Sequence, residues 1–214
     1  HGNAPRKSSQ DVRSRDIPEQ LPQQARRLLR TVLRQLSPAV LIANKVGFVV
    51  QIQRHPEVLR SSVLGLVLET ARALDVERQS DGPRSLLHGI PVVLKDNVDT
   101  QDMPTTAGSL LLKGSIPPND AFIVSKLRQA GAIILGKANM SEFASGVTIS
   151  SVDGPMLNPH DLSRTPSGSS GGTGVSIAAS FAQLGIGTDT GGSVRGPSSS
   201  NGVAGLKPTH GLLS

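Results

Sequence analysis

Two glycine-rich segments that carry serines are the part of this sequence best suited to chemistry. The first is Gly168–Gly174 and the second is Gly187–Arg195, so that Ser169 and Ser193 lie 24 positions apart. Glycine lets the backbone come close to a ligand and leaves main-chain N–H groups uncovered, so that they can point at an anion. One interpretation is a serine nucleophile beside such amides. The other is a helix cap or a phosphate-binding loop.

A lysine at the end of an apolar run is the third candidate for chemistry. The run Ile90–Leu94 predicts a buried strand, and Lys95 follows it directly. An outward-facing, solvated ammonium is one interpretation, because burying a charged lysine without a partner is costly. A buried lysine with a functional role is the alternative.

The segments around these residues alternate between predicted helices and strands. The spacing of apolar residues predicts helices over 56–78 and 120–130, and a run of small residues predicts another over 175–182. A second strand is expected over 132–136, and residues 145–166, which include three prolines, are expected to form a long loop. This order predicts an α/β fold with its functional groups at strand ends.

The first 36 residues differ in charge from the rest of the chain. They contain eight Lys and Arg against three Asp and Glu, so most of the net charge of +6 lies there. An amphipathic helix is predicted over 18–36, with its basic face in solvent; contact with an acidic membrane surface or a targeting role is the alternative. We therefore divide the chain into a basic segment, 1–36, and one domain, 37–214.

Composition argues against several classes of function. The chain has no Cys, and its five His residues show no ligand spacing, so neither a metal nor a cofactor is expected. Aromatic residues make up 2%, which disfavours base stacking and hence nucleic-acid binding. No apolar run approaches the roughly 18 residues of a membrane span. A soluble protein, with the cytoplasm favoured as its compartment, is expected.

Several blocks of the sequence together resemble the amidase signature family. Gly168–Gly174 and Gly187–Arg195 resemble that family's glycine- and serine-rich signature. The segment His88–Asn97 is similar to the family's lysine segment, and Thr105–Ser109 to the threonine-rich stretch after it. The likeness runs from about Glu69 to Ser214. It implies an α/β fold with a mixed sheet flanked by helices.

The resemblance implies acyl transfer from a carboxylic amide, with no cofactor. Ser193 would be the nucleophile, and Lys95, acting as a neutral amine, would accept its proton through the hydroxyl of Ser169. The family has a cis peptide bond at the Ser169 position. The expected oxyanion and substrate-binding residues are Thr190, Gly191, Gly192, Asn139 and Ala144.

Four polar residues of the two motifs are expected to be structural. Asp189 and Arg195 are predicted to form a buried pair that holds the nucleophile loop. Ser170 is expected to be a hydroxyl at a helix start, and Thr188 a structural hydroxyl of the second loop.

Three functions remain open. The first is an amidase acting on a small or medium acyl amide, and the second is the amide-cleaving subunit of a glutamine-dependent aminoacyl-tRNA amidotransferase. The third is a non-catalytic remnant. Because the chain stops at Ser214, well short of the family's usual length, the fold is expected to be incomplete at its C-terminal side. We therefore expect these 214 residues alone to be inactive or poorly soluble.

Overall fold

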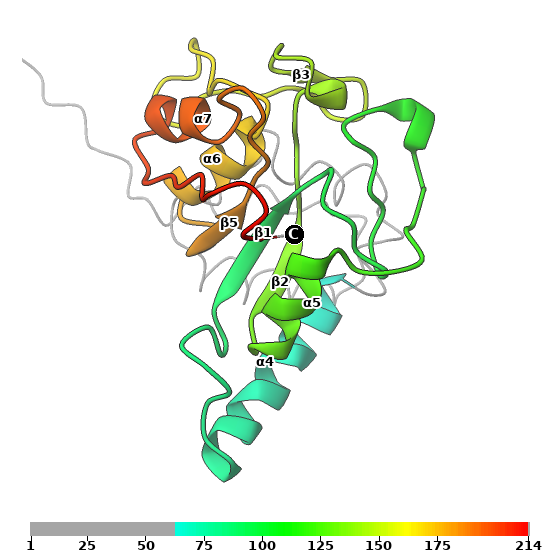
Figure 1. The fold of residues 1–214 in the computed structure, drawn as a ribbon, viewed down its shortest axis with the longest axis vertical. Helices are drawn as coiled ribbons and strands as arrows, with labels where there is room; N and C mark the ends of the chain where they lie inside the picture. Colours follow the sequence, from blue (N-terminus) through cyan, green and yellow to red (C-terminus); the bar gives the residue numbers. More distant parts are fainter. Residues whose placement is uncertain (1–62, 214) are drawn as a thin grey trace, which may run out of the picture. The chain divides into compact units, whose positions relative to one another are not determined.

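The computed structural model describes residues 63–213 (Figure 1). The predicted helix over 18–36 and the rest of the basic segment lie outside the described residues. The described elements follow in chain order; η marks a 3-10 helix. They are α4 (Val63–Ser80), β1 (Pro91–Lys95), η1 (Leu110–Leu112), α5 (Phe122–Gln129), β2 (Ile133–Ala138), η2 (Glu142–Ala144), β3 (Ile149–Ser150), β4 (Gly154–Pro155), α6 (Gly171–Ala178), β5 (Leu184–Ile186) and α7 (Arg195–Ser200).

A parallel three-stranded sheet positions the lysine. Its strand order is β2-β1-β5, so β1 is the central strand, as Figure 1 shows. The register pairs Leu94 with Lys137 and Lys95 with Ala138, which places Lys95 at the carboxyl end of β1. The antiparallel pair β3-β4 forms a separate sheet. The predicted α/β fold is therefore confirmed.

The two faces of β1 have different neighbours. Val92 and Leu94 are fully buried and cluster with Val124 and Leu127 of α5. Burial of a side chain of this kind contributes roughly 1.5–3 kcal/mol to folding. Because successive strand residues alternate between faces, Lys95 points to the other side, where α6 and the serine segments lie.

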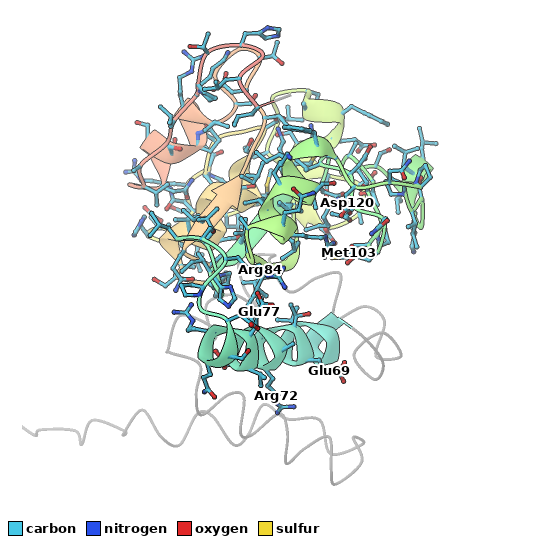
Figure 2. The ribbon with its side chains drawn as sticks, turned by 60° about the horizontal axis from the view of Figure 1, so that its bottom comes forward. Glu69, Arg72, Glu77, Arg84, Met103 and Asp120 are labelled. Carbon is cyan, nitrogen blue, oxygen red and sulfur yellow. The ribbon has the colours of Figure 1, made fainter. Side chains whose placement is uncertain are left out.

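Among the side chains of α4 that the structure describes, Leu74 is the buried one and most of the others are exposed. Leu74 is 5% exposed. Figure 2 shows Arg72 directed away from the sheet and Glu77 on the side toward Arg84. The helix ends at Ser80, just before Gly82, which has a φ of +83°. Within the described residues, no helix has both the length and the apolar character needed to cross a membrane.

The prediction of a continuous loop over 145–166 is wrong at two places. The segment contains β3 and β4, which pair Ile149 with Pro155 and Ser150 with Gly154. Strands of two residues are too short to produce an alternating pattern, and β4 begins at Gly154, whose φ of +79° is a conformation that favours glycine.

Helix α6 begins at Gly171, four residues before its predicted start, although glycines disfavour helix. The glycine at 172 is required by packing, because an added Cβ there would lie 2.2 Å from the carbonyl oxygen of Asn139. Helix α7 has no counterpart among the predicted elements. Its sequence, Arg-Gly-Pro-Ser-Ser-Ser, has weak helix propensity, but the Asp189 carboxylate accepts hydrogen bonds from Val194 and Arg195 at its start.

Candidate active site

Lys95 is buried at the centre of a polar cluster. Its side chain is inaccessible to solvent, and its Nζ lies 2.6 Å from Ser169 Oγ and 2.7 Å from Thr188 Oγ1. Burial lowers the pKa of Lys95 to about 8, while the negative charge of Asp189 acts in the opposite direction. The buried interpretation of this lysine is therefore the one that the structure supports, and a neutral amine is accessible in mildly alkaline solution.

Ser169 lies just before α6, in a segment packed closely against the chain that follows β2. The peptide bond between Gly168 and Ser169 is cis, as the resemblance implies. The carbonyl oxygen of Ser169 accepts a hydrogen bond of 3.1 Å from the Ser141 amide. An added Cβ at Gly168 would lie 2.5 Å from Ser141 Oγ. These contacts fix the position from which the Ser169 hydroxyl reaches Lys95.

Ser193 lies between β5 and α7, in the second glycine-rich loop. Its carbonyl oxygen accepts a hydrogen bond of 3.1 Å from the amide of Ser170, the residue directly after Ser169. Ser193 is half-buried, whereas Ser169 is fully buried. The structure therefore joins Lys95 and Ser169 directly, and it holds the main chain of Ser193 against Ser170, the residue after Ser169. Ser193 itself is partly accessible to solvent.

The carboxylate of Asp189 organises the loop that carries Ser193. It accepts hydrogen bonds from the main-chain amides of Gly192, Val194 and Arg195, and from the Arg195 guanidinium at 3.1 Å. A second cation, Lys207, lies 3.3 Å from it. The Arg195 guanidinium and these amides hold the pKa of Asp189 far below its usual range.

The expected pair of Asp189 and Arg195 is present, but only half of it is buried. The Asp189 side chain is 3% exposed and the Arg195 side chain is 57% exposed. The carboxylate is buried because the loop folds around it, whereas the guanidinium approaches it from the solvent side. The role as a scaffold that the sequence indicated therefore belongs mainly to the carboxylate.

The loop amides differ in whether they are free to bind an oxyanion. The Gly192 amide donates to Asp189 at 2.8 Å, so it does not point into the site as expected. The amides of Thr190, Gly191 and Ser193 make no hydrogen bond to any of residues 63–213. Space is open beside Gly191, where an added Cβ would meet no atom within 4 Å. The candidate donors are thus Thr190, Gly191 and Ser193 itself.

The hydroxyls of Ser170 and Thr188, which were expected to be structural, form hydrogen bonds within the site and do not cap a helix. Ser170 occupies the position before α6 without capping it; its hydroxyl donates to the carbonyl oxygen of Thr188 and accepts from the Thr188 amide. Thr188 Oγ1 accepts from both Lys95 and the side-chain amide of Asn97, at 2.7 and 3.1 Å.

Thr188 and Asn97 are therefore residues of the site whose contacts sequence reasoning missed. The available signal is position, because Asn97 lies two residues after Lys95 and Thr188 lies in the nucleophile motif.

The two residues expected to bind the acyl group have different environments. Asn139 is buried, and its side chain is bound internally to the Met140 amide and the Gly154 carbonyl. Its carbonyl oxygen also accepts from the Gly172 amide, so Asn139 holds α6 in place. Ala144 is exposed in η2, at a φ of +58°. Asn139 thus has a structural role. Of these two residues, Ala144 is the one whose side chain is exposed and can contact a ligand.

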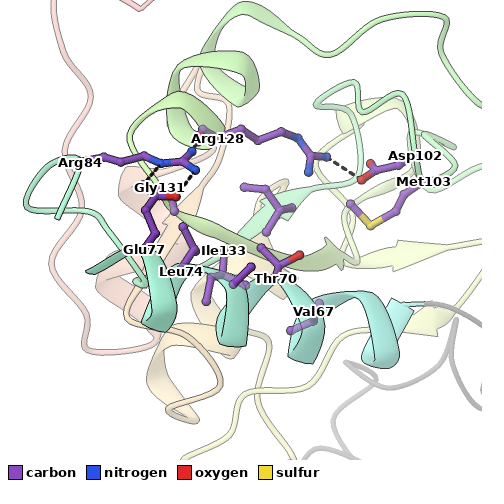
Figure 3. A pocket seen from close by; sticks show the side chains of 13 residues that line it. Val67, Thr70, Leu74, Glu77, Arg84, Asp102, Met103, Arg128, Gly131 and Ile133 are labelled. Carbon is purple, nitrogen blue, oxygen red and sulfur yellow. Dashed lines mark hydrogen bonds and ion pairs between the residues drawn. The ribbon is translucent and has the colours of Figure 1, made fainter. Parts of the chain in front are cut away.

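A cavity of about 390 Å³ lies away from these residues (Figure 3). It is bounded by α4 and by the start of β2, whereas Lys95 pairs with the residue at the end of β2. Two ion pairs lie at its edge, Arg84 with Glu77 at 2.5 Å and Arg128 with Asp102 at 2.7 Å. Because parallel strands place their carboxyl ends at one edge of the sheet, this cavity is separate from the serine and lysine site.

The sequence matches the family model described as Amidase over residues 48–214. It is 52% identical over 148 residues to the A subunit of the glutamyl-tRNA(Gln) amidotransferase of Acidothermus cellulolyticus, an alignment that covers 69% of this chain and 29% of that protein. The chain spans about 30% of the length of curated relatives of this kind.

Solved structures of the same kind resemble the described fold. The native peptide amidase of Stenotrophomonas maltophilia has a TM-score of 0.69 at 39% identity, over 89% of this chain and 40% of that one. The A subunit of the glutamyl-tRNA(Gln) amidotransferase of Thermotoga maritima has a TM-score of 0.58 at 41% identity, over 71% of this chain and 36% of that one.

Proposed function

Because this chain belongs to the amidase family, we propose that its protein hydrolyses a carboxylic amide through an acyl-enzyme formed on Ser193. The observation that carries this proposal is the distance of 2.6 Å between the buried Nζ of Lys95 and Ser169 Oγ, beside the loop that holds Ser193. A buried amine of lowered pKa in contact with a hydroxyl is a base that can activate a serine.

The contacts of Lys95 determine where its lone pair points. A neutral amine has two N–H groups and one lone pair. The hydroxyl and carbonyl oxygens of Thr188, at 2.7 and 3.4 Å, accept the two N–H groups. The lone pair is then left to accept the proton of Ser169 Oγ. Thr188, itself held by Asn97, thus orients the base toward the relay serine.

In each half of the proposed reaction, a proton reaches Lys95 by two linked transfers and then returns. Ser193 Oγ forms a bond to the amide carbonyl carbon as its proton passes to Ser169 Oγ and the Ser169 proton passes to Lys95 Nζ. The carbon–nitrogen bond then breaks, and the leaving amine or ammonia takes the proton back along the same path. In the second half a water molecule attacks the ester carbon, and its proton passes through Ser169 to Lys95. The bond between that carbon and Ser193 Oγ then breaks, the proton returns along the same path to Ser193 Oγ, and the carboxylic acid is released.

The loop that Asp189 fixes supplies the electrostatic part of catalysis. The carbonyl oxygen gains negative charge in the tetrahedral intermediate, and the free amides of Thr190 and Gly191 are suited to bind it. One such donor contributes roughly 3–4 kcal/mol to catalysis when it is held rigidly. The Asp189 carboxylate provides that rigidity because it binds three main-chain amides of the same loop.

A serine-directed fluorophosphonate tests the proposal directly. We expect it to label the wild-type protein on one serine, and Ser193→Ala to abolish labelling. Ser199→Ala is the matched control, since Ser199 is exposed in the neighbouring helix α7 and should be dispensable. Labelling that persists in Ser193→Ala would exclude Ser193 as the nucleophile. Absence of labelling in the wild type would instead favour a non-catalytic remnant.

A second candidate function is supported by several curated relatives. Those at 46–52% identity are A subunits of glutamyl-tRNA(Gln) amidotransferases. On this alternative, the same serine would cleave glutamine and pass ammonia to a partner enzyme. Ammonia release from simple acyl amides by the protein alone supports the amidase. Glutamine cleavage that requires partner proteins supports the amidotransferase.

A further inference from the structure

A second buried lysine lies beside the first strand, and the proposed reaction does not use it. Lys137 of β2 is 1% exposed in its side chain, and its Nζ lies 3.8 Å from Oδ1 of Asp96, which is 5% exposed. Lys137 also donates to Thr105 Oγ1 at 2.7 Å. Burial lowers the pKa of Lys137 and raises that of Asp96, because each charged form is deprived of water.

The Asp96 carboxylate joins three segments of chain. Its Oδ2 accepts hydrogen bonds from the Thr106 hydroxyl, the Thr106 amide and the Gly108 amide. Its Oδ1 has no hydrogen-bond partner among the described residues, so Lys137 is the group that compensates its charge. Asp96 thereby links the end of β1, the end of β2 and the threonine-rich loop.

The main chain of Asp96 also connects the end of β1 to the end of β2 and to the threonine-rich loop. Its amide donates to the Ala138 carbonyl at 3.1 Å, and its carbonyl accepts from the Ala107 amide at 3.0 Å. In the register of the sheet, Lys137 is paired with Leu94, so it lies on the face opposite Lys95. The contacts of Asp96 therefore act on Lys95 through the backbone that the two neighbours share.

We propose that Asp96 is a positioning residue for Lys95: compensated by Lys137 and bound by Thr106, it fixes the end of β1 so that the amine stays buried against Ser169 and Thr188. This inference extends the proposed function, on which its catalytic consequence rests. Loss of the anchor loosens the strand end, admits water to the amine and weakens the proton relay.

The sign of a pKa change separates this role from a simple charge effect. The Lys95 amine is faced by the hydroxyls of Ser169 and Thr188 and by the charge of Asp189; Asp96 and Lys137 lie across the sheet. Removing the negative charge of Asp96 would, by Coulomb's law alone, lower the pKa of Lys95. Loss of burial raises it. An upward shift in Asp96→Asn therefore reports a change of position.

The experiment is an NMR titration of the protein labelled with 13C at lysine Cε, with the Lys95 signal assigned by its absence in Lys95→Met. We expect the pKa of Lys95 to rise by about one pH unit in Asp96→Asn, which lowers the neutral fraction at pH 7 about tenfold. Fluorophosphonate labelling at that pH should slow by the same factor. Thr106→Val removes a partner of Asp96 without changing any charge, and should shift the pKa in the same direction.

Asp120→Asn is the matched control, because Asp120 is also buried, at 7% exposure, and paired with a cation, Arg128 at 2.9 Å. It should leave the pKa of Lys95 unchanged. An unchanged or lowered pKa in folded Asp96→Asn would overturn the proposal. If that variant does not fold, an unchanged pKa in Thr106→Val overturns it. A wild-type protein that is not labelled refutes the proposed function, while the NMR shift still decides the role of Asp96.

Discussion

An alanine at Gly172 would place its Cβ 2.2 Å from the carbonyl oxygen of Asn139 and 2.7 Å from the Asn139 nitrogen. Both are backbone atoms beyond the end of β2, so neither can rotate out of the way. Helix α6 would have to move by about 1 Å before the contact became an ordinary van der Waals one. The movement would also disturb the hydrogen bond from the Gly172 amide to the same oxygen.

The size of the effect follows from competing terms. Overpacking costs roughly 1–3 kcal/mol, and a weakened hydrogen bond costs about 1 kcal/mol more. Alanine recovers about 1 kcal/mol through its higher helix propensity. We therefore expect Gly172→Ala to lower the free energy of unfolding by roughly 2 kcal/mol. Because Ser169 lies three residues before Gly172, a displacement of this size should slow labelling of Ser193 about a hundredfold.

Gly171→Ala provides the control in the same helix. Its Cβ would meet Sδ and Cε of Met156 at 3.0 and 3.2 Å, and these are atoms of a flexible side chain that can move. This variant should be near wild type in both stability and labelling. Thermal unfolding and fluorophosphonate kinetics of the two variants, measured side by side, make the comparison. Equal stability and equal rates in the two alanine variants would refute the idea that the Asn139 backbone fixes the position of α6.

Three further predictions concern the proton relay. Activity should rise with pH through the lowered pKa of Lys95, about 8, and level off above it, because the amine must lose its proton to act as a base. The variant Lys95→Arg should be inactive, since a guanidinium group stays protonated and cannot act as the base. A wild-type rate that is flat from acid to alkaline pH would contradict the role of Lys95 as the base. Thr188→Val removes the acceptor shared by Lys95 and Asn97, at a cost of roughly 1–3 kcal/mol, so labelling should slow about ten- to hundredfold. A Thr188→Val rate close to that of the wild type would show that the threonine does not orient the amine.

The elements that the sequence predicted well are those with a local cause. The apolar run before Lys95 predicts a strand, and β1 lies there with a shift of one residue. The helix α5 has a regular apolar spacing and lies inside its predicted range, 120–130. Such patterns depend on neighbours within a few residues, and they survive in any tertiary context that buries one face.

The elements that were missed have causes far away in the chain. The early start of α6 depends on the backbone of Asn139, and α7 depends on the carboxylate of Asp189. In both cases a long-range contact overrides an unfavourable local propensity, which no local pattern records.

The same division holds for the site. By itself, the sequence determined the family, the residue types and their order, since the spacing of the serines in two glycine-rich segments and the lysine after an apolar run are local properties. Tertiary structure alone decided what each group contacts. Lys95 meets Ser169 and Thr188 across 74 and 93 positions of the chain, and Asp189 takes the Gly192 amide that was expected to face the substrate. Burial and hydrogen-bond geometry arise only when distant segments pack together. The tertiary structure therefore sets the pKa of Lys95 and the direction of its lone pair.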